Sequence, residues 1–164
     1  MRILLADNDV VTREEISKML KSFGYDVTMV DDGIELLEHI NPVGVENLEK
    51  PELVITEILM PNLDGYSAAK IARTQFESDV PIVAITHIPQ NDVVEISEPF
   101  VSVIRKPVNE HELLKVILTL TCPNCFSTIL ALDHKQHQHF DCKRCRKRYL
   151  LQQQNGELVV TEKS

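Results

Sequence analysis

The sequence predicts an α/β protein in which a five-stranded, parallel, doubly wound sheet is followed by a small four-cysteine domain. Short apolar runs alternate with segments that carry apolar residues three and four positions apart, which is the pattern of parallel β-α units. Several apolar runs end in a polar or charged residue, as strands do when a site lies at the carboxyl edge of the sheet. All four cysteines follow residue 121, in two C-x-x-C pairs.

The composition is consistent with two folded parts. Of the 164 residues, 43% are hydrophobic and 26% are charged, so the chain can bury a core. The net charge of −8 is uneven, because residues 1–121 carry −11 and residues 122–164 carry +3. We therefore expect one domain over residues 1–120 and a second over residues 121–164. The amino end becomes acidic at Asp7 before a signal peptide could form, so we expect a cytoplasmic protein with no membrane partner.

The first part of the chain predicts two strand–helix pairs. Residues 2–6 and 25–30 are short apolar runs suited to strands. Apolar residues recur at helical spacing over residues 10–23, and a shorter helix is expected over residues 34–40. Residues 41–51 contain a proline near each end and predict a longer connection.

Three more strands and three more helices are predicted after this connection. The strands are apolar runs, and Asn109 is a suitable cap for the last helix. The expected strands are residues 53–57, 81–86 and 100–104, and the expected helices are residues 66–76, 91–96 and 109–120.

Polar side chains stand at the carboxyl ends of four of the predicted strands. Because these ends of parallel strands lie along one edge of a sheet, we expect the polar residues to converge on one site. They are Asp7, Asn8, Asp9, Glu57, Thr86 and Lys106.

The stretch from Pro51 to Gly65, P-E-L-V-I-T-E-I-L-M-P-N-L-D-G, resembles the third strand and following loop of the receiver (CheY-like) domain of bacterial response regulators. The order of an acidic cluster, a central acid, a hydroxyl and a Lys-Pro pair extends this resemblance over residues 1–120. The resemblance implies a flavodoxin-like receiver domain of a two-component system, acting in phosphorelay signal transduction. In this family the acidic cluster holds Mg²⁺, the central aspartate accepts a phosphoryl group, and the hydroxyl and the lysine bind its oxygens.

The sequence departs from this family pattern at two positions needed for phosphorylation, which indicates a pseudo-receiver. Asn8 stands where the family has a second acid, and hard cations prefer carboxylate ligands, so we expect Mg²⁺ binding to be weak or absent. Glu57 stands at the phosphate-accepting aspartate and adds one methylene. Because misplacement on the order of 1 Å can cost about 10²-fold in rate, we do not expect normal phosphorylation.

Three interpretations of Glu57 remain open. Its carboxylate could reach toward Lys106 or Thr86 and imitate part of the charge of the phosphorylated state, it could form a purely structural ion pair with Lys106, or it could keep some phosphate acceptance. Thr86 has a simpler interpretation, as a hydroxyl that bonds to the local backbone. Val103 stands where the family usually has an aromatic switch residue, and the Lys106-Pro107 peptide bond is expected to be cis.

The four cysteines have the spacing of a zinc ribbon. Cys122 and Cys125 form one C-x-x-C pair, and Cys142 and Cys145 form the second after a spacer of 16 residues. Each pair offers two thiolates on one tight turn, and a hairpin between the pairs would bring them together around one ion. A domain of about 40 residues buries little core, so we expect a structural Zn²⁺ to contribute to its folding.

Other interpretations of the cysteines are open as well. A rubredoxin-like site would bind iron with the same four ligands, and a thioredoxin-type redox pair would need only one C-x-x-C pair. A disulfide framework is disfavoured in a cytosolic chain. Three histidines are rival ligands, although they suit solvated hairpin positions better: His134, His137 and His139.

A basic cluster surrounds the second cysteine pair. Such residues suit contacts with phosphates, and the neighbouring Tyr149 suits base stacking, so nucleic acid is a possible partner. The same residues suit a protein partner or the acidic first part of the chain, and they offset the negative charge of a four-thiolate zinc site. The cluster consists of Lys143, Arg144, Arg146, Lys147 and Arg148.

Together these observations predict an atypical two-component response regulator that acts as a signalling adaptor through protein–protein contacts, without normal aspartate phosphorylation. The alternative is a phosphorelay-regulated or nucleic-acid-binding regulator that uses the basic zinc ribbon. An enzyme is not expected, because the sequence offers no nucleophile–base pair and a four-cysteine zinc site has no open position.

Overall fold

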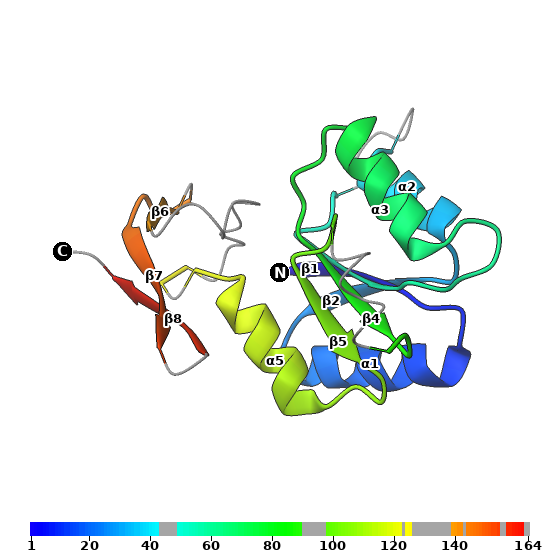
Figure 1. The fold of residues 1–164 in the computed structure, drawn as a ribbon, viewed down its shortest axis with the longest axis horizontal. Coiled ribbons are helices and arrows are strands. Elements are labelled where there is room, and N and C mark those ends of the chain that lie inside the picture. Colours follow the sequence, from blue (N-terminus) through cyan, green and yellow to red (C-terminus); the bar gives the residue numbers. More distant parts are fainter. Residues whose placement is uncertain are drawn as a thin grey trace.

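A parallel sheet of five strands and an antiparallel sheet of three organise the part of the chain that the structure describes (Figure 1). The structure is a computed structural model. It describes residues 1–42, 49–89, 98–122, 124–125, 139–142, 144–154 and 157–162.

The described elements of residues 1–120 agree with the sequence prediction in type and order, and their ends agree within two residues. The parallel sheet consists of β1 Arg2–Ala6, β2 Asp26–Val30, β3 Leu53–Glu57, β4 Ile82–Thr86 and β5 Ser102–Arg105. The helices beside it are α1 Val10–Ser22, α2 Gly33–Ile40, α3 Gly65–Thr74 and α5 Glu110–Thr119. The small sheet consists of β6 His139–Asp141, β7 Arg148–Gln154 and β8 Glu157–Glu162. The helix expected over residues 91–96 lies outside the described residues.

The large sheet has the strand order β2-β1-β3-β4-β5, and every neighbouring pair is parallel. Helices α1 and α5 cover one face, and α2 and α3 cover the other (Figure 1). The central strands β3 and β4 are buried along their whole length, because they have neighbours on both sides and helices on both faces. The predicted α/β, doubly wound, flavodoxin-like fold class is therefore confirmed.

Side-chain alternation along β1 divides the core into two layers. Ile3 and Leu5 pack with residues of α1 and α5, whereas Leu4 and Ala6 pack with residues of α2 and α3. Because both faces of β1 are buried, the strand requires an apolar run without polar interruptions. The strand was predicted from this pattern.

A side-chain cap fixes the start of each helix beside the large sheet. At α1, for example, the Asp9 carboxylate accepts the backbone N–H of Thr12 at 2.7 Å. The other caps are Asp32, Asp64 and Asn109, the last as predicted. All four caps follow the carboxyl end of a strand or its loop, so they also fix the turns along the edge where the candidate site lies.

The end of α5 connects the large sheet to the cysteines within two residues. Leu120 caps α5 and is buried in the core, Thr121 is buried beside it, and Cys122 follows. The small sheet lies beside α5, and its strand β8 contacts that helix (Figure 1). Among the described helices, none is long and apolar enough to cross a membrane.

Gly65 allows the first turn of α3 to lie against the end of β3. Its N–H donates to the carbonyl of Ile58 at 2.8 Å. A Cβ atom at this position would overlap the backbone carbonyl oxygen of Glu57 and would lie 2.8 Å from Thr56 Oγ1. Because backbone atoms cannot move aside as a flexible side chain can, only glycine fits here.

We expect Gly65→Ala to lower the free energy of unfolding by about 1–3 kcal/mol, because the added methyl group must push α3 away from β3. Urea unfolding followed by circular dichroism measures this change. Lys70→Ala, at an exposed position of the same helix, is the control and should change stability by less than about 0.5 kcal/mol. Equal unfolding midpoints for Gly65→Ala and the wild type would contradict this account of the contact.

Candidate functional site

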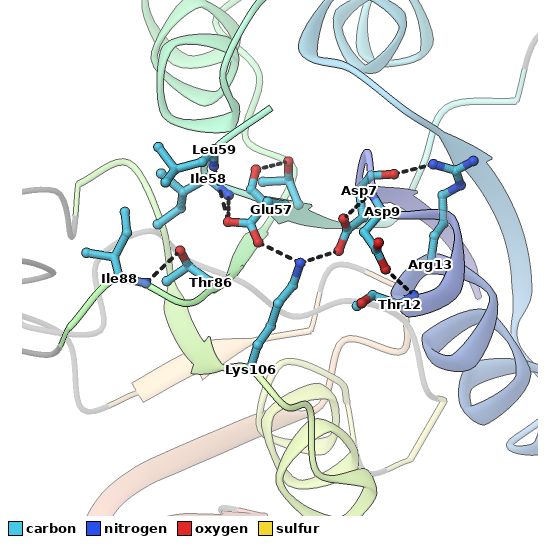
Figure 2. A network of polar contacts seen from close by, with 11 residues as sticks. Asp7, Asp9, Thr12, Arg13, Glu57, Ile58, Leu59, Thr86, Ile88 and Lys106 are labelled. Carbon is cyan, nitrogen blue, oxygen red and sulfur yellow. Dashed lines mark hydrogen bonds and ion pairs between the residues drawn. The ribbon is translucent and has the colours of Figure 1, made fainter. Parts of the chain in front are cut away.

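Three of the six sequence-predicted residues meet in one buried contact at the carboxyl edge of the large sheet (Figure 2). The ammonium nitrogen of Lys106 lies 2.6 Å from Asp7 Oδ2 and 2.6 Å from Glu57 Oε2. At most 6% of each of these three side chains is exposed. One cation therefore bridges two carboxylates that come from the ends of β1 and β3.

Lys106 keeps its positive charge in this position. Burial alone would lower the pKa of its ammonium group, but hydrogen bonds and ion pairs with Asp7 and Glu57 outweigh burial and raise the pKa above its usual value. The Lys106-Pro107 bond that follows is cis, as predicted.

The Glu57 carboxylate is fully engaged. While Oε2 faces Lys106, Oε1 accepts the backbone N–H groups of Ile58 at 2.7 Å and Leu59 at 3.1 Å. The extra methylene of glutamate lets the side chain curl back onto the loop that follows its own strand (Figure 2). Both oxygens therefore have partners without a bound ion.

Asp7 is equally enclosed. Its Oδ1 accepts the N–H of Asp9 at 2.9 Å, and its Oδ2 faces Lys106. The guanidinium group of Arg13, one turn into α1, donates to the backbone carbonyl of Asp7 (Figure 2). Arg13 thus contacts the backbone of Asp7, while Asp9 and Lys106 contact its side chain.

Asn8 and Asp9 do not join the buried contact. Both are exposed, and the Asp9 carboxylate serves as the cap of α1. Its hydrogen bonds with Thr12 lower the pKa of Asp9, with smaller contributions from Lys106 and Arg13. The predicted acidic cluster is therefore divided between one buried carboxylate and two exposed side chains.

Thr86 bonds to the local backbone, which was the simpler of its two interpretations. Its hydroxyl oxygen accepts the N–H of Ile88 at 3.2 Å, and the described side-chain contacts of Lys106 and Glu57 do not include this hydroxyl. The backbone N–H of Lys106 donates to the Thr86 carbonyl at 2.9 Å. Val103 lies in β5 opposite Ala84 and is half-buried. The described part of the edge therefore has no aromatic side chain in the position of the family's switch residue.

Two parts of this site were missed by the sequence analysis. The backbone amides of Ile58 and Leu59 carry no side-chain signal, so only the structure can identify them as partners of Glu57. The sequence contained a weak indication that Arg13 belongs to the site. A cation one helical turn after an acidic residue at the end of a strand lies within reach of that residue. Its bond is to a carbonyl, however, which the sequence does not encode.

The four cysteines form a second candidate site, with the geometry of a metal centre. Their sulfur atoms all lie within 4.8 Å of one another. The Sγ–Sγ distances are 3.6 Å between Cys122 and Cys145 and 3.6 Å between Cys125 and Cys142. A tetrahedral zinc ion with Zn–S bonds of about 2.3 Å places its ligands roughly 3.8 Å apart, so the arrangement fits such an ion.

The two cysteine pairs come from different structural contexts. Cys122 lies three residues after the end of α5, whereas Cys142 and Cys145 lie in the turn between β6 and β7. In that turn Cys142 donates its N–H to the carbonyl of Lys147 at 2.9 Å and accepts the N–H of Arg146 at 2.8 Å. No disulfide joins any two of these four cysteines.

The basic cluster is partly exposed, but its aromatic neighbour is not. Arg144, Arg146 and Arg148 are exposed and Lys147 is half-buried, while Lys143 lies outside the described residues. Tyr149 is only 1% exposed and its hydroxyl lies 3.3 Å from Cys122 Sγ. The idea that Tyr149 stacks on bases is therefore wrong, because the ring packs among the cysteines.

The side chains of the three rival histidine ligands lie outside the described part of the chain. His134 and His137 lie outside the described residues, and only the backbone of His139, in β6, is described. The four sulfur atoms already supply a complete tetrahedral ligand set.

Known proteins resemble this chain over its first part. The family described as "Response regulator receiver domain" matches residues 3–118. Transcription factor SKN7 of Candida albicans is 32% identical over 117 residues, which are 70% of this chain and 20% of that protein. Response regulator MprA of Mycobacterium leprae is 33% identical over 86 residues, 52% of this chain and 35% of that protein. The chain thus spans at most about a third of the length of these two relatives.

Solved receiver domains share the fold. The receiver domain of sensor histidine kinase PA1611 from Pseudomonas aeruginosa PAO1, with a magnesium ion in its active site cleft, has a TM-score of 0.59 and 28% identity, covering 70% of this chain and 92% of that one. The receiver domain of the Francisella response regulator 1452 has a TM-score of 0.60 and 26% identity, covering 69% and 89%. The chain therefore belongs to the response regulator receiver domain family, which its residues 3–118 match.

Proposed function

We propose that this chain is an atypical two-component response regulator, a signalling adaptor that acts through protein–protein contacts and without normal aspartate phosphorylation. The observation that carries the proposal is the buried bridge from Lys106 to Asp7 and Glu57, with both distances at 2.6 Å. In a phosphorylatable receiver the corresponding lysine binds the phosphoryl group and the acid binds the metal. Here Lys106 and the Asp7 carboxylate are already paired with each other.

The same bridge argues against tight Mg²⁺ binding. A metal ion at Asp7 would have to displace a buried ammonium group from Oδ2. The neighbouring Asn8 is neutral, and hard divalent cations prefer carboxylate oxygens. We infer that Mg²⁺ binds this pocket weakly or not at all.

Glu57 is also poorly placed to accept a phosphoryl group. Its Oε1 is held by two backbone amides and its Oε2 by Lys106, so neither oxygen is presented to a phosphodonor. The carboxylate supplies a negative charge to Lys106 and to the amides of Ile58 and Leu59. We infer that Glu57 fixes one conformation of the pocket independently of phosphorylation, by a contact that leaves Thr86 out.

The cysteine site is proposed as a structural zinc ribbon. Four thiolates fill a tetrahedral zinc site and leave no position for substrate, which supports a folding role rather than catalysis. We divide the chain into a receiver over residues 1–120 and the ribbon and tail over residues 121–164. The absence of a long linker between Leu120 and Cys122 means that the ribbon is held by α5, so a protein partner would recognise the two parts together.

The proposed adaptor has no catalytic role and works in the cytoplasm. Its partners are other proteins of a signalling pathway, reached through surfaces that do not depend on a membrane. This proposal rests on the enclosed pocket and on the closed four-thiolate site.

A nucleic-acid-binding regulator is the second candidate. Three exposed arginines around one turn favour it, and two relatives are named transcription factors, SKN7 of Candida albicans and prr1 of Schizosaccharomyces pombe. The net charge of −8 and the burial of Tyr149 favour a protein partner instead. In this candidate the exposed arginines would contact phosphates, and the buried Tyr149 would not stack on bases.

We expect the amides of Leu59, Thr86 and Lys106 to keep their chemical shifts when Mg²⁺ and beryllofluoride, a phosphoryl mimic, are added to the protein. The reason is that both carboxylates are already paired with Lys106. NMR titration of labelled protein is the measurement. The double variant Asn8→Asp, Glu57→Asp should show saturable shifts, and Mg²⁺ alone serves as its control. Saturable shifts in the wild type would refute the phosphorylation-independent pocket.

We expect one zinc ion per chain by elemental mass spectrometry and its loss in Cys142→Ser. Because zinc binding supplies folding free energy, chelation should remove hydrogen-exchange protection from β7 and β8 while β1 and β3 keep theirs. The receiver strands are thus an internal control. If the protein instead contains iron and shows the visible absorbance of a four-thiolate iron site, the metal is iron and not zinc. A metal-free protein whose β7 amides are still protected from exchange would contradict a structural role for either metal.

We expect no steeply salt-dependent binding of DNA or RNA, measured by fluorescence anisotropy. If nucleic acid is a ligand, the triple variant Arg144→Ala, Arg146→Ala, Arg148→Ala should reduce the slope of log K against log salt by roughly 3. The matched control removes three exposed lysines of the receiver, by Lys18→Ala, Lys21→Ala and Lys70→Ala. A slope lost only in the arginine variant would favour the second candidate over the adaptor.

A further inference from the structure

The turn between β6 and β7 carries two exposed arginines on an ordered backbone. Arg144 and Arg146 lie on either side of Cys145, and both side chains are exposed. The N–H of Cys142 donates to the Lys147 carbonyl at 2.9 Å. The N–H of Arg146 donates to the Cys142 carbonyl at 2.8 Å. Because these bonds already fix the turn, a partner that binds the two guanidinium groups does not have to order the backbone.

Arg146 has a backbone conformation that is unusual for arginine. Its φ is 58°, in the left-handed region, where the Cβ atom of an L-residue is crowded and glycine is the least costly residue. Burial does not explain the arginine, because its side chain is exposed. Compensation of a zinc–thiolate charge does not require it either, since Arg144, Lys147 and Arg148 supply cations at positions without a positive φ. A strained residue with an exposed side chain points to a use of that side chain at the surface.

The charge of the rest of the chain limits which anion suits this turn. Residues 1–121 carry −11, and α5 of that part contacts β8 of the small sheet. A nucleic acid carries one phosphate per nucleotide, so most of its charges would find no cation on this turn and would be repelled by the acidic part. A short protein segment needs only a few carboxylates, and a guanidinium group binds a carboxylate through two parallel hydrogen bonds. A run of acidic residues therefore suits the turn better than a nucleic acid does.

We propose that Arg144 and Arg146 form a docking site for an acidic protein segment, which belongs to the partner of the signalling adaptor. The inference rests on the proposed function, because it assigns that protein contact to the turn between β6 and β7. Each guanidinium group pairs with a carboxylate of the segment, and the ordered turn sets the spacing between the two pairs. The strained backbone at Arg146 is the structural cost of placing the second guanidinium group there.

Fluorescence anisotropy on the zinc-loaded full chain tests this site, with a short labelled peptide of alternating Asp and Ser residues as the probe. Arg146→Gly is the sharpest variant, because glycine accepts the left-handed φ and keeps the N–H that donates to Cys142. Only the guanidinium group and the strain are lost. Arg144→Ala removes the other guanidinium group, and elemental mass spectrometry checks the zinc content of each variant.

We expect Arg146→Gly and Arg144→Ala each to weaken peptide binding roughly threefold, because each loses one exposed guanidinium–carboxylate pair. Arg146→Gly should release zinc to a chelator no faster than the wild type, because the substitution relieves backbone strain. Glu77→Gly is the matched control. Glu77 is also an exposed residue with a left-handed φ, of 48°, but it lies in the receiver and is acidic, so its loss should not weaken binding.

A wild-type protein that binds neither the peptide nor a single-stranded DNA of equal charge would overturn this inference and leave the adaptor intact. Wild-type affinity for the peptide in Arg144→Ala and in zinc-loaded Arg146→Gly would do the same. If Arg146→Gly loses its zinc, Arg144→Ala alone decides. DNA that binds as tightly as the peptide would overturn the inference and the adaptor together, in favour of the nucleic-acid candidate. Self-association of the wild type that Arg144→Ala abolishes would assign the site to a second copy of this chain and overturn the proposed partner.

Discussion

The ammonium group of Lys106, buried between two carboxylates, determines how the carboxyl edge of the sheet is arranged. Removing charges from water is costly, and a buried pair repays that cost only when its geometry is good and its remaining atoms are hydrogen-bonded. The second condition holds at Asp7 Oδ1 and Glu57 Oε1, because each accepts backbone N–H groups. Breaking the bridge from one side would leave a buried charge uncompensated, so β1, β3 and the segment after β5 are held together by one cation.

This arrangement depends on the length of glutamate and on the absence of a side chain at Gly65. The additional methylene lets the carboxylate of Glu57 reach Lys106 and still curl back to the amides of Ile58 and Leu59. The same strand end can lie against α3 because Gly65 has no Cβ atom to meet the Glu57 carbonyl. The carboxylate and the carbonyl of one residue are thus fixed by different neighbours, which leaves Glu57 little freedom to rearrange.

Most of the fold could be predicted from the sequence because buried parallel strands require uninterrupted apolar runs, as in β3 and β4. The cysteine cluster was predictable from spacing alone, and the cap at Asn109 from residue type. It was less predictable which polar residues pair with one another at the carboxyl edge of the sheet. Asp9 and Asp7 look equivalent in sequence, but Asp9 lies three residues before Thr12 and caps α1, a signal that was available. Tyr149 follows a basic run and resembles a surface residue, and only the fold places its ring among the cysteines.

The two candidate sites are joined by α5, and this has a consequence for how the chain could signal. Lys106 stands four residues before the start of that helix, and Cys122 stands three residues after its end. Ile117 and Leu120 anchor the last turn in the receiver core, while Tyr149 binds the sulfur of Cys122 from the small sheet. A shift of α5 would therefore move one of the four clustered cysteines directly, with no flexible linker to absorb it. A pocket fixed by Glu57 would hold α5 and the ribbon in one relative arrangement, which is what a partner that recognises a constant surface requires.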